Sequence, residues 1–217
     1  MKTFSIIIIG LLIGANLSFG QGTVIFANSP ISRVYTNSYS GGPASGLTST
    51  NENSYYYALF IAPTTVTNVS GTAFSDINWT FTGNYATNNI NRAGLFHGGY
   101  NSDGTVTVPG YETGSPANFL VVGWSANIGA TVTALINWYN NPIMNGWLGQ
   151  SVISFNQYLG GGIQPAPSIF AQVGSTNLGE IDGFTFNAIL VPTPEPSAIA
   201  LFALSGGWLM LRARRRK

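Results

Sequence analysis

Short runs in which apolar and polar residues alternate make up most of the chain between residues 21 and 190. The apolar positions are rich in aromatic and β-branched residues, which is typical of strands with one buried face. Seven runs predict strands: Thr23–Ala27, Tyr55–Ile61, Ile77–Thr82, Thr105–Val108, Phe119–Trp124, Val152–Phe155 and Phe184–Leu190. Turn-forming clusters such as Asp103-Gly104 and Gly160–Gly162 lie between them. The pattern predicts an all-β domain of the β-sandwich or jelly-roll kind.

One segment, Ala130–Asn140, has the period of a helix instead. Its apolar residues fall at i, i+3, i+4 and i+7, the stripe of an amphipathic helix: Val132, Leu135, Ile136 and Tyr139. Thr131 is a suitable N-cap, and Asn141-Pro142 would end the helix. We expect a short helix across one end of the sandwich. A strand over Thr131–Thr133 is the competing interpretation.

The first 20 residues have the pattern of a secretory signal peptide. Lys2 supplies the positive charge, Ile6–Ile13 is an apolar run broken only by Gly10, and Ser18-Phe19-Gly20 ends with small residues at the −3 and −1 positions. The pattern predicts cleavage after Gly20, which leaves Gln21 at the new N-terminus. A retained membrane anchor is the alternative.

The last 27 residues form a second targeting pattern, in three parts. Prolines make Val191–Pro196 an extended spacer, because each fixes its own φ and lacks a backbone donor. The run Ala198–Leu211 is apolar apart from Ser205; as a helix it would be roughly 21 Å long, against roughly 30 Å for a hydrocarbon core. Arg212–Lys217 is strongly basic and should stay in the cytoplasm. We expect a marginal transmembrane helix; an apolar terminus packed on the domain is the alternative.

This tail resembles the PEP-CTERM sorting signal of Gram-negative bacteria. The resemblance covers about 25 of the 217 residues. The residues that carry it are the triplet and the basic end: Pro194, Glu195, Pro196, Arg212, Arg214, Arg215 and Arg216. It implies export across the inner membrane, a transient C-terminal anchor, and processing by an exosortase, a membrane cysteine protease. Proteins with this signal are commonly linked to exopolysaccharide, and reach the cell surface or the medium.

A looser resemblance extends through the region in front of the tail. The layout from Gln21–Asn28 through Phe119–Trp124 to Gly146–Ser151 is similar to that of uncharacterised secreted PEP-CTERM proteins of Verrucomicrobia-type bacteria. Neither resemblance implies an activity. The chain is thus divided into a signal peptide (1–20), one β-domain (21–190) and a sorting tail (191–217).

Charge and cysteine content narrow the functions open to the domain. Residues 21–190 hold two arginines and six carboxylates, a net charge of −4, whereas the basic residues gather in the tail. A nucleic-acid partner therefore has no support. The chain has no cysteine, which excludes disulfides and thiolate metal sites. We expect no cofactor.

Few residues in the domain are arranged for catalysis. His97 is the only histidine, and no Gly-x-Ser-x-Gly or His-Glu-x-x-His motif surrounds it. Glu180 and Asp182 would share one face of a strand, and they resemble part of the Glu-x-Asp-x-x-Glu motif of laminarinase-like hydrolases. The final acid of that motif is missing here, so a hydrolase would need a second carboxylate from Glu112, Asp103 or Asp76. Asp103 is a candidate calcium ligand, but the full alternating-acid loop is absent and an Asx turn alone explains the residue.

Exposed aromatic rings would indicate a glycan-binding face. Trp79 alternates with polar residues and should face inward with Ile77 and Phe81. Trp138 lies off the predicted helical stripe and Trp147 lies in a predicted loop, so these two are the candidate glycan platform. We expect an exported, non-catalytic surface or matrix protein. The alternatives are a carbohydrate-binding module and, least favoured, a glycan hydrolase.

Overall fold

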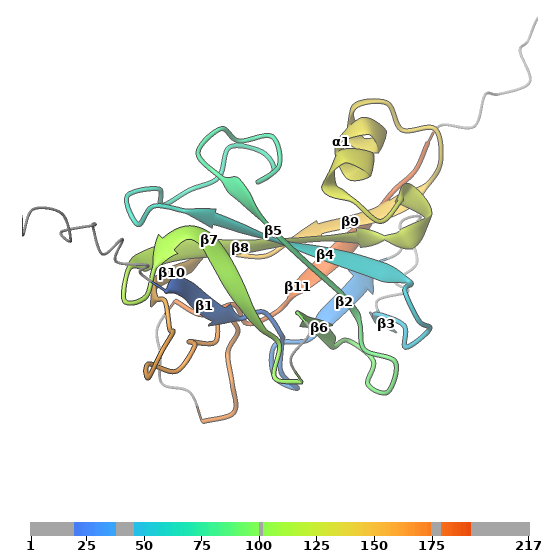
Figure 1. Cartoon of the computed structure of the whole chain (residues 1–217). Helices are drawn as coiled ribbons and strands as arrows, with labels where there is room; N and C mark the ends of the chain where they lie inside the picture. Colours follow the sequence, from blue (N-terminus) through green and yellow to red (C-terminus); the bar gives the residue numbers. More distant parts are fainter. Residues whose placement is uncertain (1–19, 38–45, 100–101, 175–178, 192–217) are drawn as a thin grey trace, which may run out of the picture.

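The computed structural model describes residues 20–37, 46–99, 102–174 and 179–191, which form an all-β domain with one α-helix (Figure 1). The strands are β1 (Gln21–Ile25), β2 (Val34–Asn37), β3 (Gly46–Leu47), β4 (Tyr55–Ala62), β5 (Thr80–Asn88), β6 (Phe96–Gly98), β7 (Thr105–Glu112), β8 (Pro116–Ser125), β9 (Gly146–Gln150), β10 (Ser154–Tyr158) and β11 (Phe184–Ile189). A 3-10 turn, η1 (Ala126–Ile128), precedes the helix α1 (Val132–Asn140). The prediction of an all-β domain is confirmed.

Nine of the described strands form one large sheet, and β1 pairs with β7 in a separate two-stranded sheet. The path through the large sheet is β3-β2-β11-β9-β8-β4-β5-β6, and β10 pairs with β8 beyond the end of β9. Strands β4 and β8 lie at its centre and pair antiparallel along the whole length of β4. Strands β11 and β2 pair in parallel, so the sheet is mixed.

Both faces of the central strands are buried. On β4, Leu59 packs into one apolar cluster and Phe60 into another, and Val121 and Val122 of β8 alternate in the same way. The first cluster lies between the large sheet and β1–β7, while the second lies under α1. Because a strand covered on both faces needs apolar residues at consecutive positions, β4 and β8 appear in the sequence as unbroken apolar runs.

The phenylalanine Phe186 of β11 is fully buried where three strands approach closely. A Cβ built on Gly123 of β8 would lie 2.5 Å from its ring, and one built on Gly149 of β9 would lie equally close. Any larger residue at these two positions would meet the ring of Phe186. These glycines therefore provide space for an aromatic side chain of the core.

The helix predicted from the sequence is present and begins one residue after Thr131. The Thr131 hydroxyl accepts a hydrogen bond from the backbone N–H of Ala134 at 3.1 Å, as expected for an N-cap. The buried residues of α1 are Val132, Leu135 and Trp138, spaced at i, i+3 and i+6. The helical interpretation is confirmed, and the competing strand over Thr131–Thr133 is wrong.

Strand β5 begins later than predicted. Ile77 is 97% exposed in the loop before β5, so its predicted inward orientation is wrong. Trp79 is buried as predicted, and its indole Nε1 donates to the backbone oxygen of Asn68 at 3.1 Å. The Asp76 carboxylate accepts from the backbone N–H of Asn78 at 2.9 Å and stabilises a turn between Ile77 and Trp79. This turn interrupts the alternation of buried and exposed side chains.

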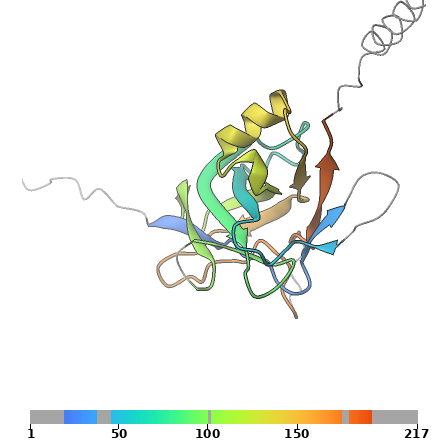
Figure 2. The ribbon, with the colours of Figure 1, turned by 90° about the vertical axis from the view of Figure 1, so that its right-hand side faces the viewer.

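The two ends of the described domain lie on opposite sides (Figures 1 and 2). Strand β1 begins on one side, whereas β11 ends beside α1 on the other. The predicted signal peptide and sorting tail lie outside the described residues, except for Gly20 and Val191. Over the described part of the chain, no helix combines the length and the apolar character that crossing a bilayer requires.

Candidate binding groove

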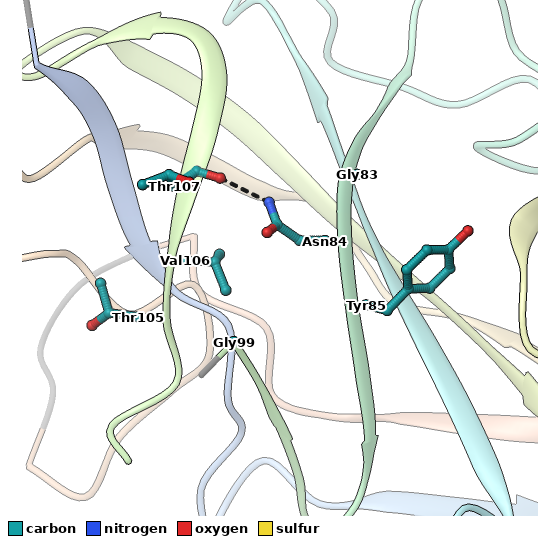
Figure 3. A pocket seen from close by; sticks show the side chains of 7 residues that line it. All are labelled: Gly83, Asn84, Tyr85, Gly99, Thr105, Val106 and Thr107. Atoms are coloured by element: carbon teal, nitrogen blue, oxygen red, sulfur yellow. Dashed lines mark hydrogen bonds between the residues drawn. The ribbon is translucent and has the colours of Figure 1, made fainter. Parts of the chain in front are cut away.

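An open groove of about 550 Å³ lies between β5 and β7 (Figure 3). Its described lining residues are Gly83, Asn84, Tyr85, Gly99, Thr105, Val106 and Thr107. The groove therefore separates the edge of the large sheet from the small sheet.

A bulge in β5 shapes one wall of this groove. The β4–β5 register shifts between Ala58 and Phe60, and Gly83 on the opposite strand has a φ of +85°, which favours glycine. Strand β6 pairs with β5 only from Ala86 onward, so it does not cover this part of the edge. Across the groove, Asn84 Nδ2 donates to the backbone oxygen of Thr107 at 2.8 Å (Figure 3). This hydrogen bond links the two walls of the groove.

The described lining of the groove is uncharged and combines amide, hydroxyl and backbone groups with apolar surface such as Val106. Its one aromatic residue, Tyr85, turns its ring away from β7 (Figure 3). The Tyr85 hydroxyl accepts from the backbone N–H of Val132 at 3.0 Å, which holds it on the side of α1. Amide, hydroxyl and backbone groups can hydrogen-bond a neutral polar ligand, but this lining supplies no acid, base or stacking face.

Asp103 lies just before β7 and forms the Asx turn that the sequence allowed. Its two carboxylate oxygens accept from the backbone N–H and the hydroxyl of Thr105, at 3.0 and 2.9 Å. The backbone hydrogen bond is the main cause of its lowered pKa, followed by the hydroxyl. Across the described ranges, no three His, Asp or Glu side chains lie close enough together to hold a metal ion.

The other candidate catalytic residues lie elsewhere. His97 is in the middle of β6 and half-buried, and it is paired through its backbone with Thr87 and Ala27. Glu180 and Asp182 flank the fully buried Ile181, just before β11; Asp182 is exposed, whereas Glu180 is half-buried and its Oε2 is buried. Of these residues, none lines the groove between β5 and β7.

Trp138 does not provide the predicted glycan platform. It is only 5% exposed, and its indole Nε1 donates to the backbone oxygen of Met144 at 2.8 Å. The loop after α1 folds back over the ring, so the buried arc of the helix is wider than the predicted stripe. Tyr139, predicted to face the core, is partly exposed instead.

The prediction that Trp147 lies in a loop is also wrong, because this residue lies in β9. It pairs with Ala188 of β11 and packs, half-buried, against the cluster between the sheets. Gly146 and Gly149 on either side of it weaken the strand pattern in the sequence. A Cβ on Gly146 would lie 2.7 Å from Ile128, so packing explains this glycine.

Sequence reasoning also missed the groove itself. The signals that could have indicated it are the Gly83-Asn84 pair inside an otherwise β-forming run and the alternating threonines Thr105 and Thr107. Comparisons with protein-family models, with curated proteins and with solved structures find no match for this chain.

Proposed function

We propose that this chain is an exported, non-catalytic protein of the cell surface or extracellular matrix, sorted by an exosortase through its tail. The observation that carries the proposal is the order of the three tail parts: Pro194-Glu195-Pro196, the apolar run Ala198–Leu211 and the basic end. The transient anchor would hold the domain outside the inner membrane until processing. The PEP-CTERM resemblance supplies the expected partners, the exosortase and an exopolysaccharide layer.

The arrangement of the described domain supports a role without catalysis. The lone histidine lies within a β-strand and the Asp103 carboxylate is engaged by Thr105. The largely uncharged character of the domain suits a matrix component that stays soluble through amides and hydroxyls.

We also infer that the architecture is a reduced β-sandwich. The packing of β1 and β7 over one face of the large sheet supports this, since side chains of both sheets share one apolar cluster. The second layer would then consist of these two strands alone, with α1 covering the opposite face.

The intact mass of the protein recovered from outside the producing cell tests the sorting proposal. We expect a chain that starts at Gln21 and ends near Pro194–Pro196. A recovered mass that still includes Arg212–Lys217 would overturn the proposal, because the tail would then be a permanent anchor.

A second candidate function is glycan binding in the groove between β5 and β7. The observation that favours it is the neutral hydrogen-bonding lining, which suits sugar hydroxyls. Thr107→Val removes the hydroxyl of an exposed residue that lines the groove and keeps the side-chain shape, whereas Thr185→Val makes the same change on β11. If the groove binds glycans, a glycan array will detect binding that is weakened by the first substitution and unchanged by the second. Equal effects of both substitutions, or no binding by the unsubstituted domain, would contradict this candidate.

A further inference from the structure

We propose that the end of the domain where β11 meets α1 is a lipid-contacting surface that rests on the bilayer while the tail is inserted. This inference rests on the proposed function, which puts Ala198–Leu211 in the membrane. Beyond the sorting proposal, it specifies how the domain is oriented on the bilayer and which of its residues contact lipid.

The chain leaves the domain at a fixed point. Ile189, the last residue of β11, pairs with Gly146 at the start of β9. Two residues later, the backbone N–H of Val191 donates to Asn145 Oδ1 at 2.8 Å. The loop 141–145, which joins α1 to β9, is therefore attached to the origin of the tail, and β11 ends beside α1 in both views (Figures 1 and 2).

Apolar side chains are exposed around this exit point. Ile143, Met144 and Leu190 are 74%, 39% and 46% exposed, and we call these three residues the exit patch. Ile143 and Met144 also line a shallow hollow of about 380 Å³ against α1, whose floor includes Ala134 and Trp138. An exposed apolar patch beside an apolar hollow indicates a contact surface rather than scattered surface residues.

The charge distribution favours lipid as the partner of the exit patch. The sequence has no Asp, Glu, Lys or Arg between Glu112 and Glu180, so α1, the loop 141–145 and β9 are uncharged. Uncharged polar and apolar residues can enter a lipid interface without the cost of desolvating a carboxylate. Asp76 is on the loop that reaches α1 through the Phe74–Tyr139 ring contact, and its carboxylate is directed into its own loop by the N–H groups of Ser70 and Asn78.

The length of the spacer keeps the exit patch close to the membrane. Six residues, 192–197, separate Val191 from the apolar run. Prolines favour a semi-rigid polyproline conformation of about 3.1 Å per residue, in which six residues would span roughly 19 Å. A domain held this closely at its exit point presents the exit patch to the bilayer in preference to its other surfaces.

Single labelled cysteines provide the test, because the chain has none of its own. The variants are Ile143→Cys in the exit patch and Ile163→Cys as a matched control. Ile163 is fully exposed, and the Thr23–Gly160 bridge places its turn beside β1, on the side where the domain begins. Each chain, from Gln21 to Lys217, carries an environment-sensitive fluorophore and is reconstituted into phosphatidylethanolamine–phosphatidylglycerol vesicles.

Two quenchers report which label contacts lipid. We expect nitroxide-labelled lipid to quench the label at position 143 severalfold more strongly than the label at 163, and aqueous iodide to show the reverse order. Equal accessibility of both labels to iodide in chains that float with the vesicles would overturn the membrane contact and leave the sorting proposal intact. Failure of the chains to float would overturn the membrane insertion of the tail, and the contact with it.

Discussion

At the scale of single residues, buried asparagines link the loops of this domain to its strands. The Asn28 amide donates to the backbone oxygens of Ser32 and Gly94, at 2.8 and 2.9 Å, and accepts from the N–H of Phe96 at 2.8 Å. Asn88 and Asn118 also make two donor bonds and one acceptor bond each, all to backbone groups. An amide can satisfy donors and acceptors at once without a net charge, which explains how loops are held in a domain with few ion-pairing residues.

We predict that Asn28→Ala lowers the free energy of unfolding by about 2–3 kcal/mol, because the Phe96 N–H and the backbone oxygens of Ser32 and Gly94 each lose a hydrogen bond. Urea denaturation of the domain measures this change. Asn91→Ala is the matched control: its side chain is exposed, in the loop just before Gly94, and the expected change is below about 0.5 kcal/mol. Equal midpoints for the two variants would show that the asparagine network contributes little.

Asp76 organises the loop before β5 and should make stability depend on pH. Its pKa is lowered from the ordinary value of 3.8, mainly by the hydrogen bond from the backbone N–H of Ser70 and next by that of Asn78. A carboxylate with a lowered folded pKa stabilises the folded state above its unfolded pKa, and this contribution is lost as the pH falls through the folded value.

We therefore predict that Asp76→Asn lowers the melting temperature at pH 7, and that the difference from the unsubstituted domain shrinks below about pH 4. Thermal unfolding between pH 7 and pH 2 gives both curves. The control Glu112→Gln likewise removes one carboxylate, but an exposed one at the end of β7. A constant difference between Asp76→Asn and the unsubstituted domain at every pH would contradict the proposed role of the ionised carboxylate.

At the scale of elements, the Ser151 hydroxyl hydrogen-bonds to β8 in the gap between the end of β9 and the start of β10. Both strands pair with the same edge of β8: β9 pairs with the second half of β8, and β10 pairs with the first half of β8. Between them, Ser151 Oγ accepts from the backbone N–H of Val121 at 3.0 Å, and the Ser151 N–H donates to the oxygen of Val121 at 2.9 Å. The side chain thus replaces a sheet partner where the strand is interrupted.

We predict that Ser151→Ala costs about 1–3 kcal/mol of stability, since it leaves the buried N–H of Val121 without an acceptor. Hydrogen exchange should also become faster at Val121, the amide that loses its partner. The control Ser70→Ala changes an exposed serine whose contact with Asp76 uses only the backbone. Unchanged exchange at Val121 would rule out this account of the break.

The same elements show which parts of the fold the sequence could predict. Strands β4 and β8 were found because burial on both faces requires continuous apolar runs, and α1 because its period and its Thr131 cap agree. Strand β9 was missed because Gly146 and Gly149 are required by packing against distant side chains, Ile128 and Phe186, which no local pattern contains.

The candidate site was less predictable for a related reason. Its walls belong to β5 and β7, which lie in different sheets, so the groove exists only through their tertiary arrangement. The burial of Trp138 depends likewise on the loop that returns over α1 and accepts its indole N–H through Met144. Local periodicity indicates which residues share a face, but not what later covers that face.

At the scale of the whole molecule, the proposed delivery signals and the folded domain occupy separate parts of the sequence. Val191 is the last described residue, and its N–H is still bound to the domain through Asn145. The Pro-rich spacer follows in the sequence, so a protease acting near Pro194–Pro196 would cut after both β11 and the hydrogen bond from Val191 to Asn145. Sorting should therefore be separable from folding.

We predict that replacing Pro194, Glu195 and Pro196 together with alanine blocks processing and leaves the domain folded. The reason is that the substitution removes the proposed recognition triplet, whereas it leaves unchanged both β11, which ends at Ile189, and the hydrogen bond from Val191 to Asn145. The measurement is the intact mass and location of the protein in the producing bacterium, with a thermal unfolding curve of the purified chain. Thr193→Ala is the control, because it changes the spacer and keeps the triplet. A triple variant that is processed and released like the control would show that the triplet is not read, and a lowered melting temperature would show that sorting and folding are coupled.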